Sequence, residues 1–83
     1  MSTRERVVKI LDEALSLKGR AGRFSDDTPL LGSLPELDSM AVLSVITAIE
    51  DQFGIVIADD ELSGDTFATL GSLVRFVESK LAT

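Results

Sequence analysis

Hydrophobic residues recur at helical spacing near both ends of the chain. In residues 3–17 they stand three and four positions apart, and Ser2 and Glu5 form the pattern of a capping box at the start. Residues 69–81 carry one apolar stripe with the same period. The pattern predicts an amphipathic helix in each segment, and the first helix is expected to end near Gly19.

The middle of the chain predicts a helix of a different kind. It is expected to begin at Asp38 or Ser39, both good N-cap residues, and to end at Gln52 or Phe53, before Gly54. Its first three turns are apolar nearly all round. A helix with one buried face does not need that much hydrophobic surface. The excess indicates that part of this helix faces something other than the core.

The connecting segments differ in length. Residues 18–37 form a long loop rich in Gly, Pro, Ser and Asp, whereas residues 55–57 read as an extended connector and residues 59–63 as a short helix. Four leucines are expected to pin the long loop onto the core: Leu30, Leu31, Leu34 and Leu37. The predicted fold is all-α, a single domain of residues 1–83 with three main helices and one short helix.

Composition argues against an enzyme. The 83 residues include no His and no Cys, so the chain lacks an imidazole base, a thiolate nucleophile and the usual zinc ligands. A domain of this size also rarely encloses a substrate cleft. We therefore expect no catalytic residues and no resident metal.

Charge further narrows the partners. The formal net charge is −6, which disfavours nucleic acid because phosphate binding needs a basic surface. Six of the eight cations lie in residues 1–23, whereas residues 24–74 hold ten acids and no cation. Such a stretch predicts an acidic field that steers a basic partner. No apolar run is long enough to span a bilayer, and we expect a cytoplasmic protein.

Two other motifs give weak signals. The acidic cluster that begins at Asp59 resembles a calcium loop, but Leu70 occupies the position of the bidentate Glu. A helix start with acids that complement its dipole explains the cluster better. Gly19 and Gly22 lack the strand-to-helix context and the Lys of a phosphate loop, so they predict a helix end.

Ser39 is the strongest candidate for chemistry. An Asp-Ser pair before an apolar helix is ordinarily just a cap, but here a long loop leads to it and surplus hydrophobic surface follows it. A serine at a helix N-terminus is well placed to bear a phosphodiester, because free N–H groups and the helix dipole favour an anion there. Without His the chain cannot activate Ser39 by the usual base, so another enzyme would have to modify it.

These residues resemble the acyl carrier protein family, including peptidyl carrier domains. The family motif is Asp-Ser-Leu at the head of the second helix, and here Met40 takes the place of Leu. The resemblance covers nearly the whole chain, from the first helix to the segment 67–74 that leads into the last one. It implies that Ser39 receives 4′-phosphopantetheine from a phosphopantetheinyl transferase that uses magnesium and coenzyme A. The thiol of the arm would then hold an acyl group as a thioester.

The resemblance also assigns roles to neighbouring residues. Asp38 would help to position the transferase and its metal, while Met40, Leu43, Glu50 and Asp51 would face partner enzymes. These partners would be an acyl-loading ligase or transferase and downstream enzymes of fatty-acid, polyketide or other specialised biosynthesis, and the carrier itself would be a monomer. Five residues of the second helix would face the core or line a cavity for the cargo: Val42, Val45, Ile46, Ile49 and Phe53.

The chain also departs from the family pattern. Carriers of bacterial fatty-acid synthesis often have acids where Ala41 and Ser44 stand, and the Pro often found in the family before the third helix is replaced by Ala58. These differences favour a dedicated carrier of a secondary or specialised pathway, with fatty-acid synthesis as the alternative. An aminoacyl or peptidyl carrier remains an alternative, as does a helical interaction module in which Ser39 is only part of a cap.

Overall fold

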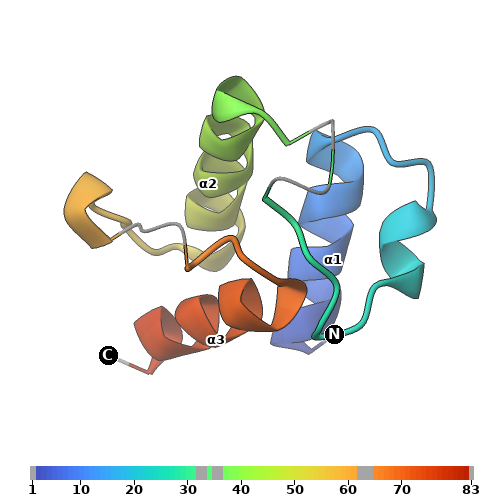
Figure 1. Cartoon of the computed structure of the whole chain (residues 1–83). Helices are drawn as coiled ribbons and strands as arrows, with labels where there is room; N and C mark the ends of the chain where they lie inside the picture. The colour runs from blue at the N-terminus through green and yellow to red at the C-terminus, as the bar shows by residue number, and fades with distance from the viewer. Residues whose placement is uncertain (1, 32–33, 35–36, 62–64, 83) are drawn as a thin grey trace.

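Three α-helices pack around one core in the computed structural model of the chain (Figure 1), which describes residues 2–31, 34, 37–61 and 65–82. The helices are α1 (Thr3–Ala14), α2 (Ser39–Phe53) and α3 (Leu70–Leu81). Two 3-10 turns lie between them, η1 (Arg20–Arg23) and η2 (Asp59–Glu61). Helix α1 contacts α2, α3 and η1. The all-α class and the three main helices are therefore confirmed.

The ends of α2 and α3 follow the capping residues in the sequence. The Asp38 side chain caps α2, and Gly54 takes the left-handed conformation (φ 67°) just after it. Thr69 caps α3 in a reciprocal capping box with Ser72. A side chain that accepts a hydrogen bond from a free N–H group at a helix start is a local signal. A glycine that turns the chain at the other end is a local signal too. The predicted bounds of both helices are correct to within one residue.

The first helix is shorter than predicted, because it ends at Ala14 and not at residue 17. Ser2 caps its start as expected. At its end, the Leu17 N–H donates to the Asp12 carbonyl oxygen at 2.9 Å, and Ser16 and Lys18 take positive φ values of 54° and 56°. Leu17 stays buried outside the helix, so the apolar spacing that predicted a longer helix reflects burial and not helical backbone.

The short elements also differ in part from the prediction. The expected short helix is the 3-10 turn η2, and residues 62 and 63 of that prediction lie outside the described residues. The turn η1 was not predicted. It follows Gly19, whose φ of 90° suits glycine, and whose N–H donates to both carboxylate oxygens of Asp12 at 2.8 and 3.0 Å. Residues 55–57 form a connector with neither helix nor strand, in agreement with the prediction of a connector and not a strand.

The long loop is tied to the start of α3 by backbone hydrogen bonds. Leu30 and Leu31 donate to the carbonyls of residues 68 and 67 at 3.0 and 2.9 Å, next to one antiparallel bridge between Pro29 and Thr69. The carbonyls of Thr28 and Asp26 accept from the first N–H groups of α3, at 3.0 and 2.9 Å. Groups that a helix start leaves unpaired are thus satisfied by a distant segment of the chain.

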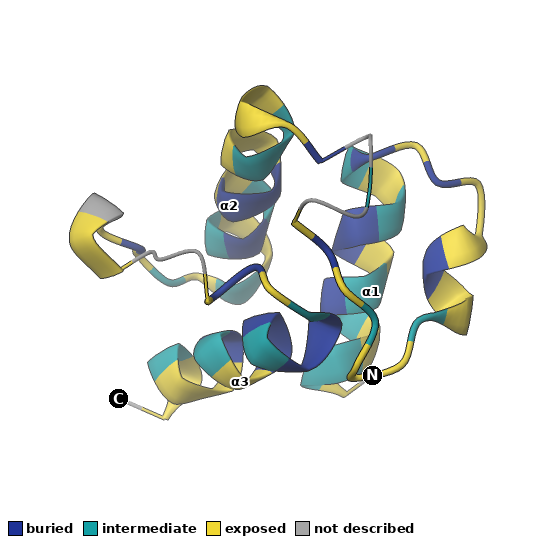
Figure 2. Ribbon diagram, in the orientation of Figure 1, coloured by how far each residue is buried: buried dark blue, intermediate teal, exposed yellow. Residues whose placement is uncertain are grey.

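The buried residues gather where the three helices face one another (Figure 2). Helix α2 contributes Val45, Ile46 and Ile49 to this core. Val42 and Phe53, expected in the core, are partly buried and pack against it. Near its start, α2 exposes Ser39, Met40 and Leu43, so this end of the helix is accessible to other molecules.

Candidate functional site

Ser39 is the first residue of α2 and is exposed to solvent. The preceding residue, Asp38, has extended backbone (φ −97°, ψ −174°), and its Oδ1 accepts a hydrogen bond from the Ala41 N–H at 2.8 Å. The Asp38 carbonyl also accepts from the Val42 N–H at 2.9 Å. Asp38 is therefore the cap, and the hydroxyl of Ser39 is not needed to hold the helix end.

The backbone around Ser39 is suited to an anion. Within the described part of the chain, the N–H groups of Ser39 and Met40 have no hydrogen-bond acceptor. Unpaired N–H groups and the helix dipole give the start of α2 a partial positive charge. A phosphodiester on the Ser39 side chain would lie beside these donors, so the residues present fit a phosphate-linked group.

A largely apolar groove of about 620 Å³ opens beside Ser39. Its lining combines the end of the long loop with the first turns of α2: Leu31, Leu37, Asp38, Ser39, Val42, Leu43 and Ile46. Leu37 and Ile46 are buried and form its inner part, whereas Leu43 is exposed at its edge. A flexible apolar group attached at Ser39 would find hydrophobic surface within reach.

Leu31 corrects the sequence analysis. The four loop leucines were expected to pin the loop onto the core, and Leu30 and Leu37 do so, with Leu34 packed against the core. Leu31 is 47% exposed and lines the groove. Leu30 and Leu31 donate consecutive N–H groups to the carbonyls of residues 68 and 67, and a turn begins here that the Leu34 N–H closes on the Leu30 carbonyl at 3.0 Å. These hydrogen bonds join segments that are distant in the sequence, so the leucine spacing carries no signal that separates Leu31 from Leu30.

The expected partner-facing residues lie along α2 but not in one environment. Met40 and Leu43 are 74% and 59% exposed, next to Ser39. Asp51 is exposed near the other end of the helix. Glu50 is only partly exposed, and its Oε2 accepts a hydrogen bond from the Ile57 N–H at 2.8 Å, so its carboxylate holds the connector after α2. The geometry brings Met40 and Leu43 to Ser39 and leaves Glu50 and Asp51 apart from it.

The acidic stretch is partly neutralised by cations from elsewhere. Asp26 pairs with Arg4 of α1 at 3.0 Å, and Glu61 of η2 pairs with Lys80 of α3 at 2.8 Å. The hydrogen bond from Lys80 lowers the pKa of Glu61 below its usual value. The field that the sequence predicted is therefore weaker along η2 than the bare count of acids indicates.

Other kinds of site find no support in the described residues. No group of three Asp or Glu side chains among them is placed to hold a metal ion. In the same part of the chain, no helix is both long enough and apolar enough to cross a membrane.

An exposed serine at a helix start, beside an apolar groove, is compatible with a covalently attached group. The comparisons with known proteins agree. A family model described as the phosphopantetheine attachment site matches residues 5–77. The chain is also similar to the solution NMR structure of a holo acyl carrier protein from Nitrosomonas europaea, with 49% sequence identity over 100% of both chains and a TM-score of 0.91. The chain therefore belongs to the family of phosphopantetheine-bearing acyl carrier proteins, which are carriers and not enzymes.

Proposed function

We propose that Ser39 is the residue that bears 4′-phosphopantetheine, and that the chain carries an acyl group as a thioester on this arm. The observation that carries the proposal is the position of Ser39, exposed at the first residue of α2, beside an apolar groove and two N–H groups that have no acceptor among the described residues. The arm supplies the thiol that a chain without cysteine lacks. Asp38 holds the helix end, which keeps the Ser39 hydroxyl available to a transferase.

The attachment is tested by mass spectrometry. The chain is coexpressed with a phosphopantetheinyl transferase of broad specificity, and we expect a mass increase of one phosphopantetheine on the peptide that contains Ser39. Ser39→Ala should abolish the increase. Because Asp38 is the cap, this substitution should change the free energy of unfolding by no more than about 0.5 kcal/mol.

Ser44→Ala is the matched control for this experiment. Ser44 is also exposed on α2, and its hydroxyl donates to the Met40 carbonyl at 3.3 Å. We expect the Ser44→Ala chain to be modified like the original one. An unmodified chain under conditions that load a control carrier, or an arm attached to another residue, would contradict the assignment of Ser39.

An acyl cargo fits the groove better than an aminoacyl cargo. The groove beside Ser39 is lined mainly by Leu, Val and Ile, and a charged amino group there would lose its hydration without a partner. We expect an eight-carbon acyl chain on the arm to perturb the NMR signals of Val42 and Ile46 and to raise the unfolding temperature. An aminoacyl group on the same arm should do neither. The reverse result would favour the aminoacyl or peptidyl carrier.

A carrier that receives its arm on Ser39 and then an acyl group needs a partner enzyme for each step. We propose a phosphopantetheinyl transferase, an acyl-loading ligase or transferase, and downstream biosynthetic enzymes, which Met40 and Leu43 would contact beside the arm. Exposed Ser44 and partly buried Ala41 leave the first turns of α2 without acids after Asp38. That surface supports a carrier of a specialised or polyketide pathway over one of general fatty-acid synthesis. We propose that the carrier is a monomer in the cytoplasm, where coenzyme A is available to the transferase.

A further inference from the structure

The side of α1 that faces away from α2 carries a second surface feature. The turn η1 packs against α1 there, so that α1 separates η1 from α2 (Figure 1). Three cations lie on or next to this turn within six residues: Lys18, Arg20 and Arg23. All three are exposed. In a chain with a net charge of −6, this is a local concentration of positive charge.

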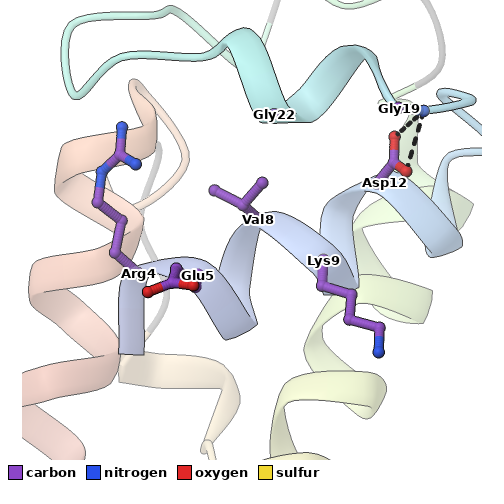
Figure 3. A pocket seen from close by; sticks show the side chains of 7 residues that line it. All are labelled: Arg4, Glu5, Val8, Lys9, Asp12, Gly19 and Gly22. Atoms are coloured by element: carbon purple, nitrogen blue, oxygen red, sulfur yellow. Dashed lines mark hydrogen bonds between the residues drawn. The ribbon is translucent and has the colours of Figure 1, made fainter. Parts of the chain in front are cut away.

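A hollow of about 400 Å³ lies between α1 and η1. Figure 3 shows that the Val8 side chain points from α1 into this space, with Gly19 and Gly22 on the opposite side. A Cβ added at Gly22 would meet no atom within 4 Å. The missing side chain therefore leaves open space above Val8, of a kind that an apolar side chain from another molecule could enter.

The hollow adjoins the cations directly. A second depression, of about 190 Å³, is lined by Lys18, Gly19, Arg20 and Arg23, and it shares Gly19 with the first. Two acids, Glu5 and Asp12, also line the first hollow, and Asp12 uses its two carboxylate oxygens to accept the Gly19 N–H. Among the described residues, Lys18 and Arg23 have no carboxylate within ion-pairing distance. Their charges are available to another molecule.

We propose that this face, composed of Val8, Gly22, Lys18 and Arg23, is a docking surface for an acidic segment of a partner protein with one apolar side chain. The apolar side chain would cover Val8 in the hollow, and the flanking carboxylates would lie against the cations. Charge complementarity selects the acidic partner, because an acidic segment is attracted here and repelled by the rest of the carrier. Since α1 separates this surface from Ser39, the carrier would bind such a segment while its arm visits an enzyme.

The experiment uses an isotope-labelled Ser39→Ala chain, so that its outcome does not depend on modification. The probe is a short synthetic peptide with one leucine between two runs of glutamate. We expect NMR shift changes centred on Val8, Gly19 and Gly22, and none at Met40 or Leu43. A peptide with alanine in place of the leucine should bind about tenfold more weakly, because it buries less apolar surface. Changes confined to α2, or none, would overturn the proposal.

Two substitutions test the parts of the surface separately. Gly22→Leu fills the hollow without backbone strain, since Gly22 has no positive φ, and it should remove the preference for leucine over alanine. Gly22→Ala is the smaller change and should have an intermediate effect. Circular dichroism and thermal unfolding check that both variants fold. If Gly22→Leu keeps the full preference for leucine, the hollow is not the binding site.

The charge contribution has a matched control. Arg23→Glu should weaken binding of the leucine peptide about fivefold. Arg75→Glu makes the same change of net charge at an exposed position on α3 and should have little effect. If both variants weaken peptide binding equally, binding responds to the total charge alone, and the proposed docking surface is wrong.

Discussion

Arg6 joins α1 to the end of α2, and we predict that Arg6→Ala destabilises the fold markedly. Its guanidinium carbon lies 4.2 Å from the centroid of the Phe53 ring. The same group donates a hydrogen bond to the carbonyl of Gln52, in the last turn of α2. A cation at this position also complements the negative end of the helix dipole. One side chain therefore makes three favourable interactions between two helices.

The magnitude follows from these contacts. A cation–π contact at a partly exposed site contributes about 0.5–1 kcal/mol, and the helix-end cation adds about 0.3–1 kcal/mol. The charged hydrogen bond contributes about 1 kcal/mol in this partly exposed setting. We therefore expect Arg6→Ala to lower the free energy of unfolding by about 2 kcal/mol. In a domain of this size, that corresponds to a fall of roughly 8–16 °C in the unfolding temperature.

The assay is urea unfolding followed by far-ultraviolet circular dichroism, with Lys9→Ala as the control on the same helix. Lys9 is exposed, and its removal should cost no more than about 0.5 kcal/mol. Arg6→Lys should fall between the two, since an ammonium keeps the charge but stacks less well than a planar guanidinium. A double-mutant cycle with Phe53→Leu should give a coupling of at least about 0.5 kcal/mol. If Arg6→Ala costs no more than Lys9→Ala, the contacts described do not stabilise the fold.

Three further predictions concern a close backbone contact, an ion pair and a strained residue. Gly71→Ala should destabilise by about 1–3 kcal/mol in chemical unfolding, because its Cβ would lie 2.9 Å from the Asp26 carbonyl oxygen. Glu61→Gln should make the free energy of unfolding depend less steeply on pH in the acid range. Because the pKa of Glu61 is lowered, the Glu61–Lys80 pair stabilises the fold above the usual carboxyl pKa, and this stability is lost as the pH falls through the lowered pKa. Unfolding curves at several pH values check this, and equal slopes for both chains would refute it. Lys18→Asn should raise the unfolding temperature slightly, since Asn tolerates the positive φ of 56° better than Lys; a lower temperature would count against strain there.

Most of the fold was predictable because its signals are local. Asp38 and Gly54 mark the two ends of α2 in the sequence, and Thr69 marks the start of α3. The end of α1 was not predictable in this way. It depends on Asp12, whose carboxylate reaches forward to the N–H of Gly19 and closes a turn that apolar spacing cannot reveal.

The candidate site, like the fold, could be predicted from the sequence only where its signals are local. The cap and apolar pattern of α2 pointed to Ser39, and the family resemblance added Met40 and Leu43, which the structure shows to be exposed beside it. Sequence reasoning placed Leu31 in the core, although this side chain is exposed, because the backbone there is held by a hydrogen bond from Leu31 to the carbonyl of Phe67, far along the chain. Glu50 looked like a free surface acid, and only the position of the connector shows its bond to Ile57.

The start of α3 is held by carbonyl oxygens of the long loop, at Asp26 and Thr28, and not by loop side chains alone. Every amino acid supplies the same carbonyl group, so this joint does not depend on which side chains stand at those two positions. The loop surface is therefore free to change its chemistry during evolution or engineering while α3 keeps its place. On the helix side, by contrast, the close approach at Gly71 admits little variation. Libraries that retarget this carrier to new enzymes should accordingly vary the loop and leave Gly71 unchanged.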